Sequence, residues 1–250
     1  MTTQNSPRPS EPVTIVDVRD PADVLPEPPG DPVRNETRVV ELHARLLDAN
    51  DRQAALNRAR LARLGIRALN FVSAPGAGKT TLLGRTLDAL GGAVRCAVLV
   101  GDLETDHDAR RLRRAGVPVV QITTGGTCHL DASMVARGLD ALPLDGVRLL
   151  FIENVGNLVC PASFDLGENR RVTLLSCAEG EDKPLKYPPL FTSAHAVVLN
   201  KIDAAVALGF DRSAAVANIR RAAPQAEVFE VSARTGEGCE AWLHYVRAIL

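Results

Sequence analysis

The segment SAPGAGKTTLL, residues 73–83, places glycines, a lysine and two threonines between an apolar run and a helical pattern. It fits GxxxxGK[ST], except that Ser73 stands where the first glycine is usual, a departure that we expect to affect only the first turn of the loop. Gly76 and Gly78 lack a Cβ, so backbone N–H groups can turn inward around phosphate oxygens. Lys79 reaches the terminal phosphates, and the Thr80 hydroxyl reaches Mg2+. We expect nucleotide contacts from Pro75, Gly76, Ala77, Gly78, Lys79, Thr80 and Thr81.

Apolar, β-branched runs recur along the rest of the chain and alternate with amphipathic stretches. The runs expected to be strands are RALNFVSA, RCAVLVG, VPVVQIT, RLLFIEN, RVTLLSC, AVVLNK and AEVFEVS. The expected helices cover residues 81–90, 106–115, 132–142, 211–223 and 239–250. Continuous apolar strands that alternate with helices are typical of a parallel sheet covered on both faces. We therefore predict one three-layer α/β domain over residues 66–250, a P-loop NTPase fold with a mostly parallel central sheet.

The chain before residue 66 divides into two parts. Residues 1–35 are rich in proline and charge, a composition that buries little apolar surface, so we expect a flexible arm; its stretch TIVDV is a weak candidate for a short strand. Residues 36–65 carry Leu42, Leu46 and Leu61 at helical spacing. We expect one helix there, or two separated near residue 50, packing on the domain that follows.

Charge and cysteine usage exclude several classes of protein. The formal net charge is −1, so no basic field attracts nucleic acid. The 5 cysteines are dispersed and odd in number, which makes a poor disulfide framework and suits a reducing compartment. No apolar run is long enough to span a bilayer, and the first residues lack the apolar core of a signal peptide. We expect a cytoplasmic protein with neither a nucleic-acid nor a membrane partner.

The segment NKID, residues 200–203, follows an expected strand far downstream of the phosphate loop. The Asp203 carboxylate can accept hydrogen bonds from N1–H and the 2-amino group of guanine, whereas adenine lacks this donor pair. Asn200 and Lys201 complete the motif. Ser232 and Ala233, in VSARTGEG after the next strand, are expected to bring a backbone N–H to the guanine oxygen. A turn-forming carboxylate is the alternative interpretation of Asp203.

Acidic residues also end two other expected strands. Asp102 follows the second strand in VGDLETD, and Glu153 follows the fourth in FIENVGN. Together with Thr80, both are candidates to hold Mg2+ directly or through water. We expect catalysis to depend on Lys79, Thr80 and Asp102. The run ENVG is similar to the DxxG switch of GTPases, with Glu in place of Asp, and we expect the N–H of Gly156 to contact the γ-phosphate.

A cysteine and a histidine stand side by side in GTCHLDA, at Cys128 and His129. In a regular strand they would point to opposite faces, but a turn at a helix start relaxes that limit. Cys160 lies four residues after Gly156, on the loop expected to move with the γ-phosphate. These three residues are a candidate metal set, and the alternative is a buried cysteine beside an incidental histidine. Of the other cysteines, Cys96 and Cys177 lie inside apolar runs and are expected in the core, and Cys239, at the start of the last expected helix, is expected to be incidental.

These motifs, taken with IENVGNLVCPA and AEGEDKPLKYP, resemble those of the hydrogenase nickel-incorporation GTPases, the HypB family, from about residue 36 to residue 250. The resemblance implies a GTPase of the dimerising, signal-recognition-like branch that helps deliver Ni2+ to the [NiFe]-hydrogenase large-subunit precursor. It also implies that Cys128, His129 and Cys160 bind nickel or zinc at the dimer interface, and that a nickel-delivery accessory protein takes part. The N-terminal cysteine cluster and the histidine-rich tract of some family members are absent here.

Three other functions remain open at this point. A urease-type nickel-delivery GTPase is related, but its Cys-Pro-His motif is absent from this chain. A nucleotide-dependent kinase with structural cysteines is disfavoured by NKID. A metal-binding scaffold that uses GTP only to fold would bind nucleotide without a hydrolysis rate that responds to metal.

Overall fold

The computed structural model describes residues 14–17, 32–103, 107–113 and 116–250, with side chains from residue 45 onward. Most of the expected arm therefore lies outside the described residues, as do residues 106, 114 and 115 of one expected helix. The strands are β1 Thr14–Asp17, β2 Arg67–Ser73, β3 Cys96–Asp102, β4 Val119–Thr123, β5 Leu149–Glu153, β6 Arg170–Ser176, β7 Ala196–Asn200 and β8 Glu227–Glu230. The longer helices are α1 Pro32–Arg63, α2 Lys79–Leu90, α3 His107–Arg113, α4 Ala132–Ala141, α8 Arg212–Ala222 and α9 Cys239–Ala248. The short helical turns are η2 Cys160–Ser163, α5 Lys183–Lys186, α6 Pro188–Thr192, η3 Ile202–Ala204 and α7 Ala205–Leu208.

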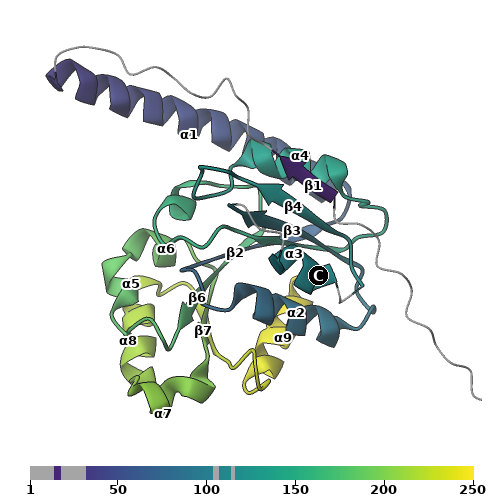
Figure 1. Cartoon of the computed structure of the whole chain (residues 1–250), viewed down its shortest axis with the longest axis vertical. Coiled ribbons are helices and arrows are strands. Elements are labelled where there is room, and N and C mark those ends of the chain that lie inside the picture. The colour runs from purple at the N-terminus through teal and green to yellow at the C-terminus, as the bar shows by residue number, and fades with distance from the viewer. Residues whose placement is uncertain (1–13, 18–31, 104–106, 114–115) are drawn as a thin grey trace, which may run out of the picture.

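The described strands form one sheet in the order β1-β4-β3-β5-β2-β6-β7-β8, and every neighbouring pair is parallel. Side chains alternate between its faces, so Leu69 and Phe71 of β2 pack with α2, α3 and α9, whereas Ala68 packs with α1 and α4. Val72 belongs to a third cluster with α6 and α8. Helices therefore cover both faces, and the predicted three-layer α/β fold is confirmed (Figure 1).

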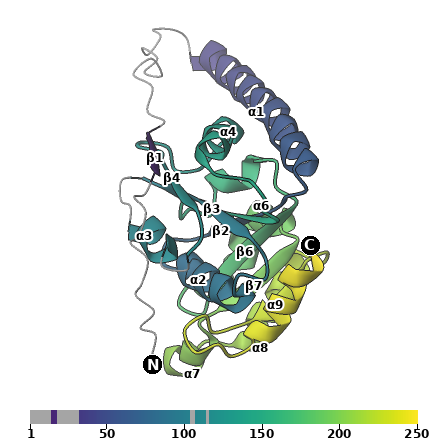
Figure 2. The ribbon, with the colours of Figure 1, turned by 90° about the vertical axis from the view of Figure 1, so that its right-hand side faces the viewer.

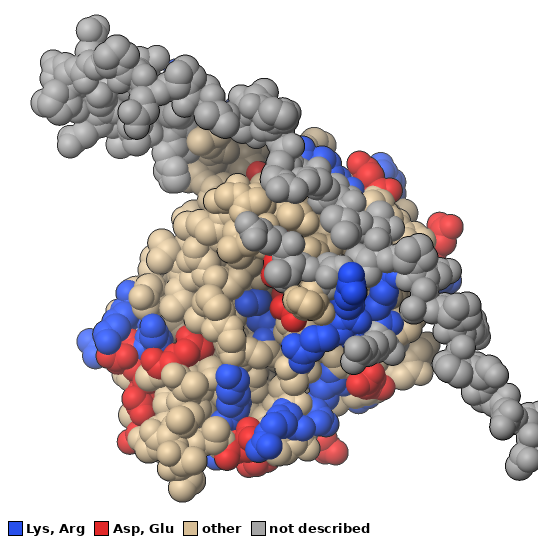
Figure 3. All heavy atoms as spheres, viewed as in Figure 1, with Lys and Arg blue, Asp and Glu red and all other residues tan. Residues whose placement is uncertain are grey.

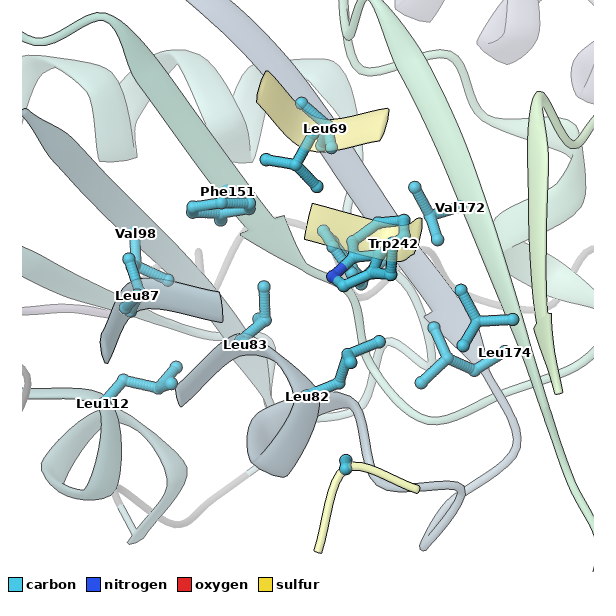
Figure 4. Packing of buried hydrophobic residues seen from close by; sticks show 14 of the residues in the cluster. Leu69, Leu82, Leu83, Leu87, Val98, Leu112, Phe151, Val172, Leu174 and Trp242 are labelled. Atoms are coloured by element: carbon cyan, nitrogen blue, oxygen red, sulfur yellow. The ribbon is translucent and has the colours of Figure 1, made fainter. Parts of the chain in front are cut away.

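The core beneath the phosphate loop is organised by Trp242 of α9, which is fully buried. Its ring centroid lies 5.8 Å from that of Phe71 at an interplanar angle of 83°, and its Nε1–H donates to Thr86 Oγ1 over 2.9 Å. Figure 4 shows Leu82 and Leu83 of α2 near it, and Leu87 of the same helix beside Val98. Helix α9 therefore fixes α2, the helix that begins at the phosphate loop, against the sheet.

Helix α1 is continuous from Pro32 to Arg63, so the possible break near residue 50 does not occur, and its first turn lies within the segment expected to be arm. Its C-terminal part lies against α4, while its N-terminal part extends away from the sheet (Figure 2). Gly65, at φ +69°, ends the helix. Four residues of the expected arm form β1, which pairs with β4 at the sheet edge. None of the described helices combines the length and hydropathy that a membrane crossing requires.

The carboxyl ends of parallel strands meet at one edge of a sheet. Here β2 lies between β5 and β6, and β3 lies on the far side of β5. The phosphate loop follows β2, and NKID begins at the end of β7. The loop that contains Gly156 and Cys160, the switch loop, follows β5. The loop that contains Cys128 and His129, the metal-ligand loop, follows β4. The parallel topology therefore gathers motifs from distant parts of the sequence at one edge.

Candidate functional site

The phosphate loop turns through two glycines in the left-handed region, Gly76 at φ +73° and Gly78 at φ +100°. A Cβ on Gly78 would lie 2.5 Å from Asn200 Nδ2, so this position has no room for a side chain. Helix α2 begins immediately afterwards, at Lys79. Free N–H groups at a helix start and its positive dipole end favour an anion, so the loop is built to hold phosphate oxygens.

Lys79 is buried, and its Nζ donates to Ser73 Oγ over 3.0 Å. Burial lowers the pKa of the ammonium group below its ordinary value, and nearby carboxylates, Glu153 first among them, oppose that shift. Ser73 was expected to affect only the first turn of the loop, but its hydroxyl contacts the phosphate-binding lysine directly. A glycine at that position would remove this contact, which the GxxxxGK[ST] pattern cannot reveal.

Thr80 and Glu153 meet across the gap between α2 and the end of β5. The Thr80 hydroxyl donates to Glu153 Oε1 over 2.7 Å. Burial raises the pKa of Glu153 to about 7, while Lys79 and the Thr80 hydrogen bond act in the opposite direction. Among the described residues, Glu153 Oε2 is buried without a hydrogen-bond partner. A hydroxyl beside an unsatisfied buried carboxylate oxygen suits Mg2+, so these residues fit that ion. Asp102 ends β3, two strands from β2 at the same sheet edge.

NKID is tied directly to the phosphate loop. Asn200 Nδ2 donates to the carbonyl of Ala77 over 2.8 Å, and Lys201 Nζ donates to the carbonyl of Gly76 over 2.7 Å. Lys201 is at φ +63°, the left-handed region, where it is the only residue other than glycine among those described. Such backbone strain persists where the surroundings enforce it, often at functional sites. The NKID segment and the phosphate loop are therefore held together by direct side-chain contacts.

Asp203 is partly buried at the start of η3, and Arg234 contacts it. Arg234 Nε and a terminal nitrogen both donate to Asp203 Oδ2, over 3.0 and 2.6 Å. A hydrogen bond from Ser232 first, and then Arg234, hold the pKa of the Asp203 carboxyl below its ordinary value. The carboxylate is thus ionised and ready to accept hydrogen bonds. The sequence did not predict the Arg234 contact, because an exposed arginine carries no motif signal.

Ser232 and Ala233 were expected to bring a backbone N–H to a guanine oxygen. In the structure the Ala233 N–H donates to Asn200 Oδ1 over 3.0 Å, and the Ser232 N–H donates to the carbonyl of Glu237 over 2.9 Å. The same loop is held from the other side by Arg85 of α2. Arg85 Nε donates to the carbonyl of Ala233 over 2.7 Å, and a terminal nitrogen donates to that of Arg234 over 2.8 Å. Arg85 was missed from the sequence because nothing in the phosphate-loop pattern extends that far into α2.

Gly156 lies against the phosphate loop. A Cβ added there would be 2.9 Å from Pro75 Cα and 3.0 Å from Pro75 N. Only glycine permits this approach. A groove of about 780 Å³ runs along α2, between α3 and α9, and is lined in part by Thr81, Arg85 and Arg111. Basic side chains gather over α2 and α3 on this face (Figure 3), which matches the charge of a polyphosphate.

Glu179, in AEGEDKPLKYP, also reaches this edge of the sheet. Its Oε1 accepts the Ser176 N–H over 2.9 Å, and its Oε2 is buried with no hydrogen-bond partner in the described part of the chain. Burial raises the pKa of its carboxyl, and Lys201 and Lys79 are among the cations that oppose the shift. This second unsatisfied carboxylate was not singled out from the sequence.

Cys128, His129 and Cys160 are brought together as expected. The sulfur atoms of Cys128 and Cys160 lie 2.9 Å apart, and Cys128 Sγ lies 3.9 Å from His129 Nδ1. One ligand atom from each of the three lies within 4.8 Å of the others, and all three residues are partly exposed. Two thiols and an imidazole at this spacing suit Zn2+ or Ni2+.

The imidazole and a thiol of this cluster are both displaced from their ordinary pKa. Burial lowers the pKa of His129, against a smaller opposing effect of Asp131, so the neutral form that binds metal is favoured. The His129 ring packs on Phe164, with centroids 3.9 Å apart. The hydrogen bond with Cys128 raises the pKa of the Cys160 thiol. Cys96 and Cys177 are buried elsewhere, as expected, and Cys239, expected to be incidental, is also buried in the core.

Comparison with known proteins agrees with this arrangement. The family model described as CobW/HypB/UreG, nucleotide-binding domain, matches residues 68–230. The hydrogenase maturation factor HypB of Azotobacter chroococcum mcd 1 is 53% identical over 216 residues, which cover 86% of this chain and 70% of that protein. HypB of Escherichia coli K12 is 50% identical over 215 residues, which cover 86% of this chain and 74% of that protein.

A solved structure of HypB from Helicobacter pylori in complex with nickel is also similar. It superposes with a TM-score of 0.76 and 40% sequence identity, over 80% of this chain and 94% of that one. The P-loop NTPase fold predicted from the sequence is thereby confirmed. The chain belongs to the HypB group of the CobW/HypB/UreG family.

Proposed function

We propose that the protein is a GTP-hydrolysing metallochaperone that assists nickel insertion into the [NiFe]-hydrogenase large subunit. The observation that carries this proposal is the position of Cys160. Its sulfur lies 2.9 Å from that of Cys128, and it follows Gly156, which lies against the phosphate loop, by four residues. One short loop therefore links the nucleotide site to the metal-ligand cluster.

Guanine selectivity is supported by Asp203. Its carboxylate is held ionised by hydrogen bonds from Ser232 and Arg234, and Asn200 and Lys201 fix the neighbouring backbone to the phosphate loop. An ionised acceptor pair matches the N1–H and 2-amino donors of guanine and leaves adenine unmatched. Both Arg234 contacts fall on Oδ2. A bound guanine therefore either displaces Arg234 from Oδ2 or shares that oxygen with it.

Hydrolysis of the β–γ phosphoanhydride bond requires positioning and charge stabilisation more than covalent chemistry. In this proposal the Lys79 ammonium group moves from Ser73 to the terminal phosphates when nucleotide binds. The negative charge of the phosphates then raises the pKa of Lys79, which burial lowers. Thr80 and Glu153, with Asp102 from the next strand, hold Mg2+, which supplies neutralisation of the charge on the transferred phosphoryl group. Gly156 presents its N–H to the γ-phosphate.

The cargo metal, Ni2+ or Zn2+, binds at Cys128, His129 and Cys160. Three ligands from one chain leave a tetrahedral ion incomplete, which suits a transfer site. A second copy of the chain completes the coordination, so the working form is a homodimer whose stability depends on nucleotide and metal. A nickel-delivery accessory protein and the hydrogenase large-subunit precursor are the expected partners.

Metal titration of the apo, GDP-bound and GTP-analogue-bound protein, with mass measured in each state, tests this proposal. We expect metal affinity and dimer fraction to differ between the GDP and GTP-analogue states. Metal binding must then alter nucleotide binding by the same factor, because coupling is reciprocal. Equal affinities and equal masses in the two states, or hydrolysis indifferent to metal, would instead favour a scaffold that binds nucleotide structurally.

A further inference from the structure

Asn154 links the switch loop to the metal-ligand loop through one oxygen atom. It follows Glu153 directly, is 1% exposed, and its backbone N–H extends the β5 ladder by donating to the carbonyl of Phe71 over 3.0 Å. Its Oδ1 accepts the N–H of Leu130 over 3.0 Å and the N–H of Val155 over 2.9 Å. A single buried acceptor therefore serves two loops.

The orientation of this amide is set by a buried chain of hydrogen bonds. The carboxylate of Glu168 is paired with Arg171 over 2.9 Å and accepts from Asn70 Nδ2 over 3.1 Å. Because Glu168 can only accept, Asn70 must turn its own oxygen the other way, toward Asn154 Nδ2 at 3.4 Å. The Oδ1 of Asn154 then faces Leu130, as observed.

Both amides held by Asn154 are next to functional residues. Leu130 directly follows His129, and its side chain packs on Gly101, where an added Cβ would lie 2.7 Å from Leu130 Cγ. Val155 directly precedes Gly156. A shift of the Gly156 peptide toward or away from a γ-phosphate therefore acts on the Val155 N–H, and through the shared oxygen on Leu130.

We propose that Asn154 is a positioning residue that transmits the nucleotide state to His129, and thereby sets metal affinity. The inference rests on the proposed function, because it concerns the regulation of the same metal site. Its physical basis is competition. Two N–H groups donate to one oxygen with fixed geometry, so a change at one donor alters the hydrogen bond of the other, and an unsatisfied buried N–H is costly.

Asn57 provides a matched comparison within the same chain. It is also a buried asparagine, and it holds the same loop from α1 by donating from Nδ2 to the carbonyls of Ala132 and Leu166, over 2.7 and 3.1 Å. It makes no described contact with Val155 or Gly156. Loss of Asn57 should therefore loosen the loop equally in every nucleotide state.

The test is Zn2+ and Ni2+ affinity, measured by chelator competition on the full chain loaded with GDP or with a non-hydrolysable GTP analogue. Wild type should show an affinity ratio between states of about 5-fold or more, the usual lower range of allosteric coupling. In Asn154→Ala that ratio should fall to about 1 while nucleotide still binds. In Asn57→Ala both affinities should fall by one common factor, leaving the ratio unchanged.

The outcomes separate the two proposals. A wild-type ratio that persists in Asn154→Ala would overturn the role of Asn154 and leave the proposed function standing. A ratio of one in wild type would overturn nucleotide coupling itself, and with it this inference. Should Asn154→Ala not fold, hydrogen exchange of the Leu130 amide in wild type decides. Its rate should differ between the GDP and GTP-analogue states, and identical rates would count against the inference.

Discussion

The nucleotide site and the metal cluster are built at the same edge of the sheet but to different degrees of completion. The phosphate loop is held by side chains of the NKID segment, with Asn200 on Ala77 and Lys201 on Gly76, and by its own contact between Lys79 and Ser73. The metal cluster holds three partly exposed ligands that lie close together. A phosphate loop fixed in this way suits a nucleotide that binds and leaves without rearranging the loop. A partly exposed cluster of ligands suits a metal ion that is passed on, as we propose.

The largest effect that separates the two sites should come from Lys79→Ala. Its ammonium is buried with a lowered pKa and contacts Ser73 without an ion pair in the described structure, so its loss should not unfold the domain. We expect GTP turnover to fall by at least about 100-fold, the usual cost of removing a donor that stabilises transition-state charge. Metal affinity of the apo protein should be unchanged. Lys186→Ala, at an exposed lysine, is the control, and near-normal turnover by folded Lys79→Ala would contradict the assignment.

Cys160→Ala should give the opposite pattern and thereby sharpen the comparison. Removal of a direct ligand should weaken Zn2+ and Ni2+ binding on the order of 100-fold, at least as much as loss of an outer-shell partner. GTP binding should stay within about twofold of wild type, since the phosphate loop is tied independently of this residue. The residual metal affinity of Cys160→Ala should be the same with GDP and with the GTP analogue. Cys96→Ala, buried at the other end of the sheet, is the matched control; equal metal affinities of the two variants would place the cargo site elsewhere.

Asp203→Asn tests the part of the nucleotide site that chooses the base. The change replaces an acceptor with a donor that faces a donor, so guanine affinity should fall by about 30-fold or more. Xanthine nucleotides, which carry a carbonyl in place of the 2-amino group, should be partly rescued. Competition binding with GTP and XTP measures the switch. If Asp203→Asn still prefers GTP, the carboxylate does not select the base; Asp182→Asn, at an exposed ion pair, controls for charge.

Arg85→Ala should have a smaller effect on the same site. It removes two hydrogen bonds to the carbonyls of Ala233 and Arg234, which hold the loop next to Asp203. We expect guanine nucleotide affinity to fall by about 5-fold, equivalent to one net hydrogen bond, with little change in turnover at saturation. Arg85→Lys, which keeps one donor group, should have a guanine nucleotide affinity between those of wild type and Arg85→Ala. An unchanged GTP affinity in Arg85→Ala would show that the loop holds its position without this contact.

The smallest effect is expected from removal of residues 1–31, which ends before α1. The removed part contains β1, whose four residues pair with β4 at the sheet edge, so a modest loss of thermal stability is expected. It holds no cysteine or histidine, so hydrolysis and metal affinity should each stay within about twofold of wild type. A larger drop in either would assign the segment a role in one of the two sites.

Much of this molecule followed from local sequence pattern. The strand, loop and helix around Lys79 were predicted because the phosphate loop has strict backbone requirements at Gly76 and Gly78. The seven main strands were predicted because strands buried on both faces are continuously apolar. The pairing of β1 could not be predicted, since a four-residue strand in a proline-rich segment carries too weak a signal. The sequence also left open whether α1 continues through Asn50, because a polar residue there interrupts the apolar stripe. In the structure Asn50 is buried and accepts a hydrogen bond from the Ala132 N–H at the start of α4.

The sequence by itself determined which chemical groups are present and at which strand ends they stand: phosphate loop, acidic residues, NKID and the Cys-His pair. Local pattern decides these because each depends on neighbouring residues. Only the tertiary structure decided which groups touch. The contacts of Arg85 with Ala233 and of Asn154 with Leu130 join segments whose separation in the chain carries no information about their distance. Strand order and side-chain rotamers set those contacts, and through them the link that we propose between nucleotide and metal.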